Sequence, residues 1–380
     1  MSYDQMRASY AEWANGLFEK IDKKLAKVTL RSRQKVPYTT KDGVHDSHDQ
    51  TGPLGITWWT NGFWGGLNWL MYEATGNDEY KTTAQNAEHL LDKAFEEFDF
   101  LHHDVGFMWH ILSGASYRIC GDTASRNRNL IAAGLLASRY NLSGGFIRAW
   151  NGDKVGWTIV DCLMNIPLLY WASNETGDSR YTQIAIAHAN MAMRDHVRPD
   201  GSTAHICSHD PATGELIETF GGQGYAVGSC WSRGLGWAIY GFILSYIHTG
   251  KQEYLDTAKR CAHYYMANAA ADNYLPRVDY RAPMEPALYD STAAVICACG
   301  LIEIAKVLNN EESRIYLEAA VKSIKAMEDA GWMNFSDNED SILQMGTGSY
   351  VKEIHMPLIY GDYFLVEALL KLKGRTFLPW

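Results

Sequence analysis

The feature of this sequence that most limits its fold is a junction that recurs along the chain. At each junction an apolar, aromatic-rich helix ends in a short turn of Thr, Gly, Asn and Asp, and a polar amphipathic helix with an early Tyr follows. Gly in the turn ends the first helix, and Asp, Ser or Asn can cap the second. The junctions are residues 72–80, 172–181, 246–254 and 307–316, with a weaker one at 116–127.

The two helices of each pair differ in composition. The first is apolar on nearly every face, as in GWAIYGFILSYI, whereas the second carries an apolar stripe, as in KTTAQNAEHLLDKAFEEF. Repeated inner-plus-outer pairs at irregular spacing are typical of a closed toroid rather than an open solenoid. With an N-terminal helix and a last helix near 361–373, the count approaches twelve. No convincing alternating strand is visible. We therefore predict an all-α fold, a closed (α/α)6 barrel that forms a single domain over residues 1–380.

Charge and composition disfavour several classes of function. The formal net charge is -10 and there is no Lys/Arg block, which argues against nucleic acid as a partner. No uncharged apolar run of membrane-spanning length and no signal peptide are visible, so we expect no membrane partner. Seven scattered Cys, most in apolar helical contexts, indicate reduced thiols and a cytoplasmic location. The Ser-hydrolase, P-loop and dinucleotide-binding motifs are also missing.

The stretch 156–173, GWTIVDCLMNIPLLYWAS, predicts a helix that is apolar on nearly every face. Asp161 is the one ionisable group in its first turns. Burial there would raise the pKa of the carboxyl group, and a carboxyl that is partly protonated near neutral pH can donate a proton and later accept one. An Asp in the first turn also favours the helix dipole, and the sequence does not separate these two interpretations.

Asp104 is a second carboxylate candidate, in LHHDVGF before the next inner segment. Paired carboxylates at a sugar-sized cleft are the basic equipment of glycoside cleavage. Asp104 is equally interpretable as the cap of a helix that begins near Phe107. The neighbouring histidines lack metal-site spacing, so we expect no metal. Hydrogen bonding to sugar hydroxyls is the favoured role of His103 and His205.

The loops that enter the inner helices are long and rich in Gly, Trp, Tyr and His, which favours binding loops that meet at one mouth. In one of them, Arg233 and Trp237 are four residues apart and share a helix face, and Gln223 lies nearby. Arg, Gln and Trp together suit an acidic sugar, through a planar cationic fork, a neutral donor and a stacking surface. The alternative is an Arg that binds backbone carbonyls and only holds the loop in place.

Several segments together resemble one family across essentially the whole chain. HHDVGF, WTIVDCLMNIPLLYWAS, GGQGYAVGSCWSRGLGWAIYGF, DSTAAVICACGL and PLIYGDYFLVEALL are similar to the unsaturated glucuronyl hydrolases, glycoside hydrolase family 88. The resemblance implies an (α/α)6 barrel, no metal or other cofactor, and unsaturated oligosaccharide substrates left by polysaccharide lyases. We expect a monomer or a small homo-oligomer.

The resemblance also implies roles for individual residues. Asp161 matches the acid/base, and Asp104 matches the second essential carboxylate. Sugar-contacting positions fall on Trp58, His103, His205, Gln223, Arg233, Trp237 and Tyr350. Members that favour sulfated substrates carry a Ser-x-x-Ser-x-Lys pattern; here Thr347 and Tyr350 replace both Ser residues, and Lys352 is kept.

The implied reaction is unusual for a glycosidase. Asp161 protonates C4 of the enol ether, water adds at C5, and the resulting hemiketal rearranges to release the next sugar. Two alternatives remain open at this point. One is an unsaturated rhamnogalacturonyl hydrolase, with similar chemistry on pectin fragments. The other is a sugar-binding α/α protein without catalysis, against which the retention of both Asp104 and Asp161 argues.

Overall fold

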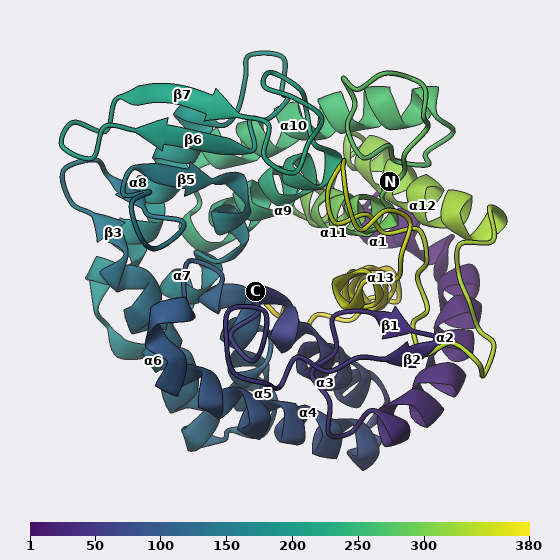
Figure 1. Cartoon of the computed structure of the whole chain (residues 1–380). Coiled ribbons are helices and arrows are strands. Elements are labelled where there is room, and N and C mark those ends of the chain that lie inside the picture. The colour runs from purple at the N-terminus through teal and green to yellow at the C-terminus, as the bar shows by residue number, and fades with distance from the viewer.

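The structure, a computed structural model that describes residues 1–380, consists of two concentric rings of helices (Figure 1). The six inner helices are α3 (Phe63–Thr75), α5 (Ser113–Cys120), α7 (Pro167–Thr176), α9 (Ser232–Thr249), α11 (Ser291–Leu308) and α13 (Ile359–Leu372). The six outer helices are α2 (Ala11–Arg31), α4 (Asp78–Leu91), α6 (Thr123–Ser138), α8 (Ser179–Asp195), α10 (Gln252–Ala271) and α12 (Ser313–Asp329).

The inner ring is closed. Helix α3 contacts α5, and each of α7, α9 and α11 contacts the next inner helix; the irregular helix η3 (Gly106–His110) contacts both α5 and α7. Helix α13 contacts α3, which joins the last helix to the first. A short helix, α1 (Tyr3–Ala8), lies against α11 and α12. The predicted (α/α)6 barrel is therefore confirmed.

The predicted junctions are the turns between inner and outer helices. Four inner helices end at a glycine in the left-handed conformation, and a fifth ends at Asn309 with φ of 44°. Asn tolerates this conformation better than other non-glycine residues. The early Tyr of an outer helix bonds to the preceding outer helix: the Tyr80 hydroxyl donates to Asp22 Oδ1 at 2.6 Å, and Tyr254 donates to Asn190 Oδ1 at 2.8 Å. The four glycines are Gly76, Gly121, Gly177 and Gly250.

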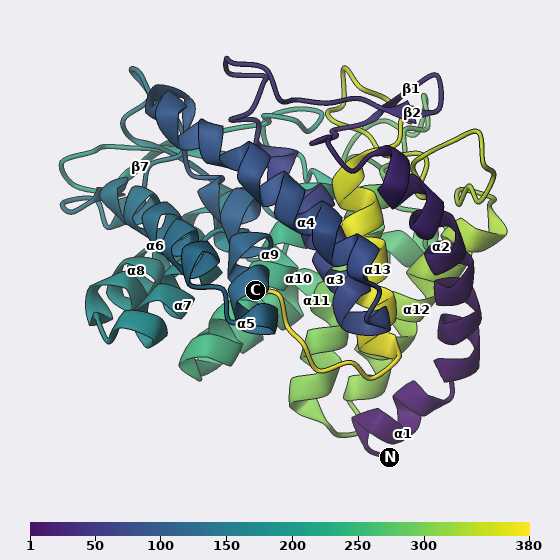
Figure 2. The same cartoon turned by 90° about the horizontal axis from the view of Figure 1, so that it is seen from below.

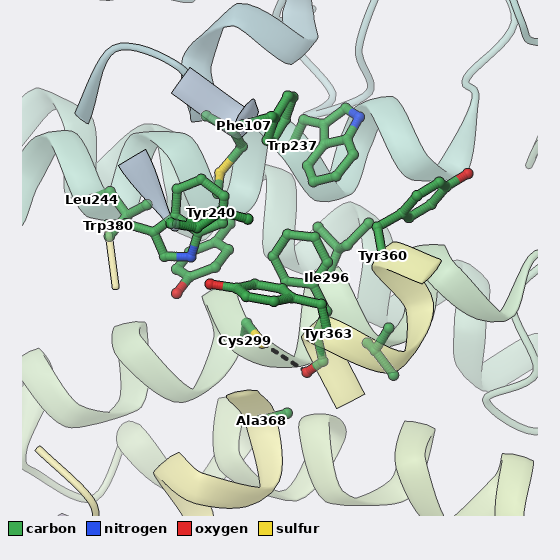
Figure 3. Packing of buried hydrophobic residues seen from close by; sticks show 14 of the residues in the cluster. Phe107, Trp237, Tyr240, Leu244, Ile296, Cys299, Tyr360, Tyr363, Ala368 and Trp380 are labelled. Atoms are coloured by element: carbon green, nitrogen blue, oxygen red, sulfur yellow. Dashed lines mark hydrogen bonds between the residues drawn. The ribbon is translucent and has the colours of Figure 1, made fainter. Parts of the chain in front are cut away.

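One hydrophobic core fills the space within and between the rings. Aromatic side chains from different inner helices meet in it, as Trp237 of α9 and Phe364 of α13 do with ring centroids 5.6 Å apart. Trp380, beyond the end of α13, packs edge-on against Tyr240 and Tyr363 (Figure 3). Helix α11 is long and apolar enough to span a membrane by length and composition, and 83% of that stretch is buried inside the barrel. A core helix has the same properties.

Short strands and irregular helices lie in the loops that enter the inner helices. The view from the side shows β1, β2 and β7 at the same end of the barrel (Figure 2). The strands are β1 (Thr40–Lys41), β2 (Val44–His45), β3 (Tyr140–Asn141), β4 (Phe146–Ile147), β5 (Trp157–Ile159), β6 (Ile206–His209) and β7 (Leu216–Phe220). The irregular helices are η1 (Trp59–Gly62), η2 (Asp92–Phe100), η3 (Gly106–His110) and η4 (Val160–Met164).

The expectation that 156–173 forms one helix is wrong. Residues 157–159 form β5, which pairs antiparallel with β6 in a three-stranded sheet. A 3-10 turn, η4, follows, and helix α7 begins only at Pro167. Proline fits the first turn of a helix but not its interior, and the run Thr158–Val160 is β-branched, so a strand forms before the helix. The sheet was missed because each strand is too short to show alternation.

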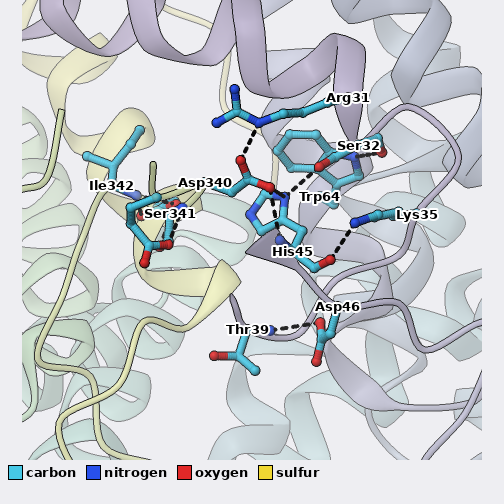
Figure 4. A network of polar contacts seen from close by, with 12 residues as sticks. Arg31, Ser32, Lys35, Thr39, His45, Asp46, Trp64, Asp340, Ser341 and Ile342 are labelled. Atoms are coloured by element: carbon cyan, nitrogen blue, oxygen red, sulfur yellow. Dashed lines mark hydrogen bonds and ion pairs between the residues drawn. The ribbon is translucent and has the colours of Figure 1, made fainter. Parts of the chain in front are cut away.

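The loop before α3 is held by a buried polar network (Figure 4). Arg31 forms an ion pair with Asp340, and Asp340 Oδ2 accepts the backbone N–H of His45 at 2.9 Å. Asp46 Oδ1 accepts the backbone N–H groups of Tyr38 and Thr39, at 2.7 and 3.1 Å. These contacts fix residues 31–48 against the loop after α12.

Candidate active site

A cavity of about 410 Å³ opens where the loops that enter the inner helices meet. Residues from five of the six loops line it; the sixth, before α11, contributes Asp290 just behind the wall. The expectation that these loops converge on one mouth is confirmed. Seven of the ten predicted site residues line the cavity: Trp58, His103, Asp104, Asp161, Gln223, Arg233 and Lys352.

Asp161 reaches the cavity from η4, directly after strand β5. Its Oδ1 lies 3.4 Å from His205 Nε2. The backbone N–H of Gln223 donates to His205 Nδ1 at 2.9 Å, so the proton of the neutral ring is on Nε2 and faces the carboxyl group. Asp161 makes no helix-capping hydrogen bond. His205 does not line the cavity but lies next to Asp161, which does.

Asp104 lies beside Asp161 and shares Asn165 with it. The Asn165 amide donates to Asp104 Oδ1 at 3.3 Å and to the backbone carbonyl of Asp161 at 3.4 Å. Burial raises the pKa of Asp104 well above its usual range, and the charge of Asp161 raises it further. The side chain of Asp104 caps no helix, so the capping interpretation is wrong.

Two histidines flank the Asp104 carboxylate. His102 Nδ1 and His103 Nε2 lie 3.3 and 3.4 Å from Asp104 Oδ2. Burial lowers the pKa of His102 to about 4 and that of His103 well below its usual range, so both rings are neutral at neutral pH. The donor atoms of these three residues lie within 4.8 Å of one another, and they are the group that a metal ion could use. A metal-free site remains a prediction.

Arg233 lines the cavity, but its guanidinium group is already occupied. Its Nη1 donates to Asp290 Oδ2 at 2.6 Å and to the Thr347 carbonyl at 2.5 Å, and Nη2 donates to the Gly348 carbonyl at 2.7 Å. The expectation of a cationic fork free for an acidic sugar therefore requires correction. Arg233 holds the loop through backbone carbonyls, as the alternative interpretation has it, while still facing the cavity.

The segment 346–356 folds as an irregular hairpin, and we call it the tip hairpin. Gly346 pairs with Met356, and Ser349 pairs with Lys352 across its turn. Gln223 holds the hairpin, since its side-chain amide donates to the Gly348 carbonyl at 2.6 Å.

Besides His205, two predicted contact residues lie away from the cavity wall. Trp237 is completely buried one turn beyond Arg233, where its ring centroid lies 5.1 Å from Phe107 and 5.6 Å from Phe364. It supports the floor of the site rather than forming the expected stacking surface. Tyr350 is partly exposed and packs edge-on against Tyr225, with ring centroids 5.0 Å apart.

Several residues that line the cavity, or lie directly behind its wall, were missed by sequence reasoning. Asp290 stood in the quoted segment DSTAAVICACGL, where it caps α11, and its position before an all-apolar helix was the available signal. Further residues that line the cavity were not predicted either, because tertiary packing brings their loops together. They include Tyr38, His48, Trp150, Trp231, Glu353 and Tyr360.

A barrel of paired helices with two buried carboxylates at its mouth defines the class of α/α-barrel glycoside hydrolases. The family profile of Glycosyl Hydrolase Family 88 matches residues 25–330. The unsaturated glucuronyl hydrolase of Bacillus sp. (strain GL1) is 38% identical over 334 residues, which cover 85% of this chain and 88% of the relative. The chain therefore belongs to glycoside hydrolase family 88 and is a glycoside hydrolase.

Two further comparisons agree with this assignment. The unsaturated chondroitin disaccharide hydrolase of Streptococcus pneumoniae (strain ATCC BAA-255 / R6) is 34% identical, over 90% of this chain and 87% of the relative. A solved structure of a UGL variant with dGlcA-Glc-Rha-Glc superposes with a TM-score of 0.87 at 32% identity, covering 94% of this chain and 97% of that chain.

Proposed function

We propose that this enzyme releases the 4,5-unsaturated uronic acid from the non-reducing end of oligosaccharides that lyases leave from glycosaminoglycans of the chondroitin, hyaluronan or heparin type. The arrangement of Asp161 and Asp104 in one cavity, with His205 next to Asp161, carries the proposal. Its relatives are named for unsaturated glucuronyl and chondroitin disaccharide hydrolysis, and one binds dGlcA-Glc-Rha-Glc.

In this mechanism Asp161 is both acid and base. As the acid it protonates C4 of the enol ether, which leaves C5 and the ring oxygen electron-poor. As a carboxylate it then takes a proton from the water that adds at C5, and the hemiketal rearranges to release the next sugar. His205 is a positioning residue: its Nε2 proton faces Oδ1 of Asp161 and leaves Oδ2 for the proton transfers.

Asp104 has an electrostatic role and takes no part in the proton transfers. Its carboxyl lies in a buried setting that also contains neutral His102 and His103. When Asp104 is ionised, its negative charge stabilises the positive charge that develops at C5.

Turnover of unsaturated disaccharides tests this proposal. The wild-type enzyme should remove the ultraviolet absorbance of the conjugated double bond. Asp161→Asn should lower kcat by about 10²- to 10⁴-fold, because an amide neither donates nor accepts the required proton. Circular dichroism should show an unchanged fold. Appreciable activity in the Asp161→Asn variant would contradict the acid/base assignment.

Isotope labelling separates hydration from ordinary glycoside hydrolysis. In oxygen-18 water, hydration places label on the C5 oxygen and leaves the anomeric oxygen unlabelled at early times, before carbonyl exchange. In deuterated water it also places deuterium at C4. Early label at the anomeric carbon, with the double bond intact, would identify a conventional glycosidase. Parallel assays with unsaturated rhamnogalacturonan disaccharides test the pectin alternative.

A further inference from the structure

A third carboxylate lines the cavity and has no part in the proton transfers. Glu353 extends from the tip hairpin into the cavity wall, next to Lys352. No ion pair joins Glu353 to Lys352 or to any other cation of the chain. Its negative charge is therefore available to whatever occupies the cavity.

Three features hold Glu353 in this position. Tyr38, a buried residue of the opposite loop, donates its hydroxyl proton to Glu353 Oε2 at 3.0 Å. The backbone of Glu353 is left-handed, with φ of 57°, which few residues other than glycine adopt. A Cβ on Gly348 would lie 2.1 Å from Glu353 Oε2, so the carboxylate occupies space that only glycine leaves open. Glu353 is an exposed residue, but these contacts hold its carboxylate at the cavity wall.

The charge balance of the cavity indicates which part of a substrate Glu353 meets. Asp104, Asp161 and Glu353 are its carboxylates, and Arg233 and Lys352 are its cations. Arg233 is already paired with Asp290, which leaves Lys352 as the unpaired cation. A carboxylate or sulfate beside Glu353 would be repelled by its negative charge, whereas a hydroxyl can donate a hydrogen bond to it.

We infer that Glu353 is a specificity-determining residue that accepts a hydrogen bond from a neutral sugar hydroxyl and rejects a sulfate ester at that hydroxyl. The inference rests on the proposed function and deepens it. A site built to accept a hydroxyl proton discriminates against a group that cannot donate one, and a fixed like charge adds to the discrimination. Tyr38 is a positioning residue in this arrangement, because its hydroxyl donates a hydrogen bond to the carboxylate and holds it at the cavity wall.

The ratio of kcat/KM for a sulfated and an unsulfated unsaturated disaccharide tests the inference. Glu353→Gln keeps an oxygen that can accept the Tyr38 proton but removes the charge. This variant should raise the sulfated-to-unsulfated ratio by about tenfold for at least one sulfation position. Tyr38→Phe should shift the ratio in the same direction by less, because the charge stays but is no longer held in place.

Glu218→Gln is the matched control, since Glu218 is exposed on β7 and does not line the cavity. It should leave the ratio unchanged. A Glu353→Gln enzyme that loses activity equally on all disaccharides, or that keeps the wild-type ratio, would overturn the inference and leave Glu353 as a structural link to Tyr38. Wild-type enzyme that acts on none of the disaccharides would instead contradict the proposed function.

Discussion

At the scale of single residues, Asp104 is needed for activity but lowers the stability of the folded protein. Its pKa is raised by burial and by Asp161, so ionising it costs the folded state free energy. That cost is present above the folded pKa and disappears once pH falls below the pKa of the unfolded chain. Asp104→Asn should therefore raise the free energy of unfolding at pH 7–8, and the gain should vanish as pH approaches about 4.

Urea unfolding of both proteins across this pH range measures the effect, and kcat should fall sharply in the same variant. Equal stability of the two proteins at every pH would show that Asp104 is solvated and has no raised pKa.

Arg233 is a second single residue on which stability depends, because it links the start of α9 to the loops before α11 and α13. Removing its side chain leaves Asp290 as a buried and uncompensated charge. Arg233→Ala should lower the free energy of unfolding by about 3–5 kcal/mol, and adding Asp290→Asn should recover part of that loss. Denaturant titration of the single and double variants gives both numbers. Arg180→Ala removes an exposed pair with Asp178 and should leave the free energy of unfolding nearly unchanged.

The sequence predicted the catalytic residues of the site better than the contacts between its side chains. Asp161, Asp104 and His103 stood out because their residue types and motifs mark chemistry, and all three line the cavity. Arg233 and Trp237 were predicted to share one helix face, and both lie in α9. Helix periodicity does not show which turn of that face meets the cavity, and only Arg233 lines it. Contacts such as Tyr38 with Glu353 join residues 315 apart, and no local pattern encodes them.

At the scale of elements, the turns between inner and outer helices depend on left-handed glycines. Gly177 ends α7 with φ of 74°, and a Cβ added there would meet no atom within 4 Å, so any cost of Gly177→Ala comes from the backbone alone. We expect a loss of about 1–2 kcal/mol in unfolding free energy.

Gly16 provides the matched control for this substitution. It lies inside α2, is exposed, and would also place its Cβ in open space. Gly16→Ala should stabilise the protein by about 0.5–1 kcal/mol, because alanine loses less backbone entropy in a helix. Thermal unfolding of the two variants should shift in opposite directions; shifts of the same sign would contradict the assigned conformations.

The same elements show how far periodicity determines the fold. Inner and outer helices differ in how far their apolar residues extend around the helix, and this difference predicted the two rings. The residues 157–159 escaped prediction because three residues are too few to show alternation, and their pairing with β6 spans about fifty residues of chain. The sheet matters for function, since η4 and Asp161 follow it directly.

At the scale of the whole molecule, the chain closes the barrel by returning to its own core. The end of the described chain lies within the ring (Figure 1), where the Trp380 ring packs parallel to Phe364 and its Nε1 donates to Glu367 Oε2 at 3.1 Å. Arg118 holds the segment before Trp380 in place, because its Nη1 donates to the Leu378 carbonyl at 2.9 Å. The same aromatic layer extends to Phe107, whose centroid is 5.9 Å from Trp380, and so lies beneath the catalytic loops.

Trp380 should therefore stabilise the fold and the floor of the site together. Trp380→Ala leaves a large cavity in this layer and an unpaired Glu367 oxygen, and we expect a loss of about 3–5 kcal/mol in unfolding free energy. Because Phe107 lies three residues from Asp104, kcat should also be lower, even when it is measured well below the melting temperature of the variant. Leu142→Ala, at a residue that is 86% exposed, should change neither quantity measurably. A Trp380→Ala enzyme with wild-type stability would show that the inner ring closes without this residue, through the contact between α13 and α3 alone.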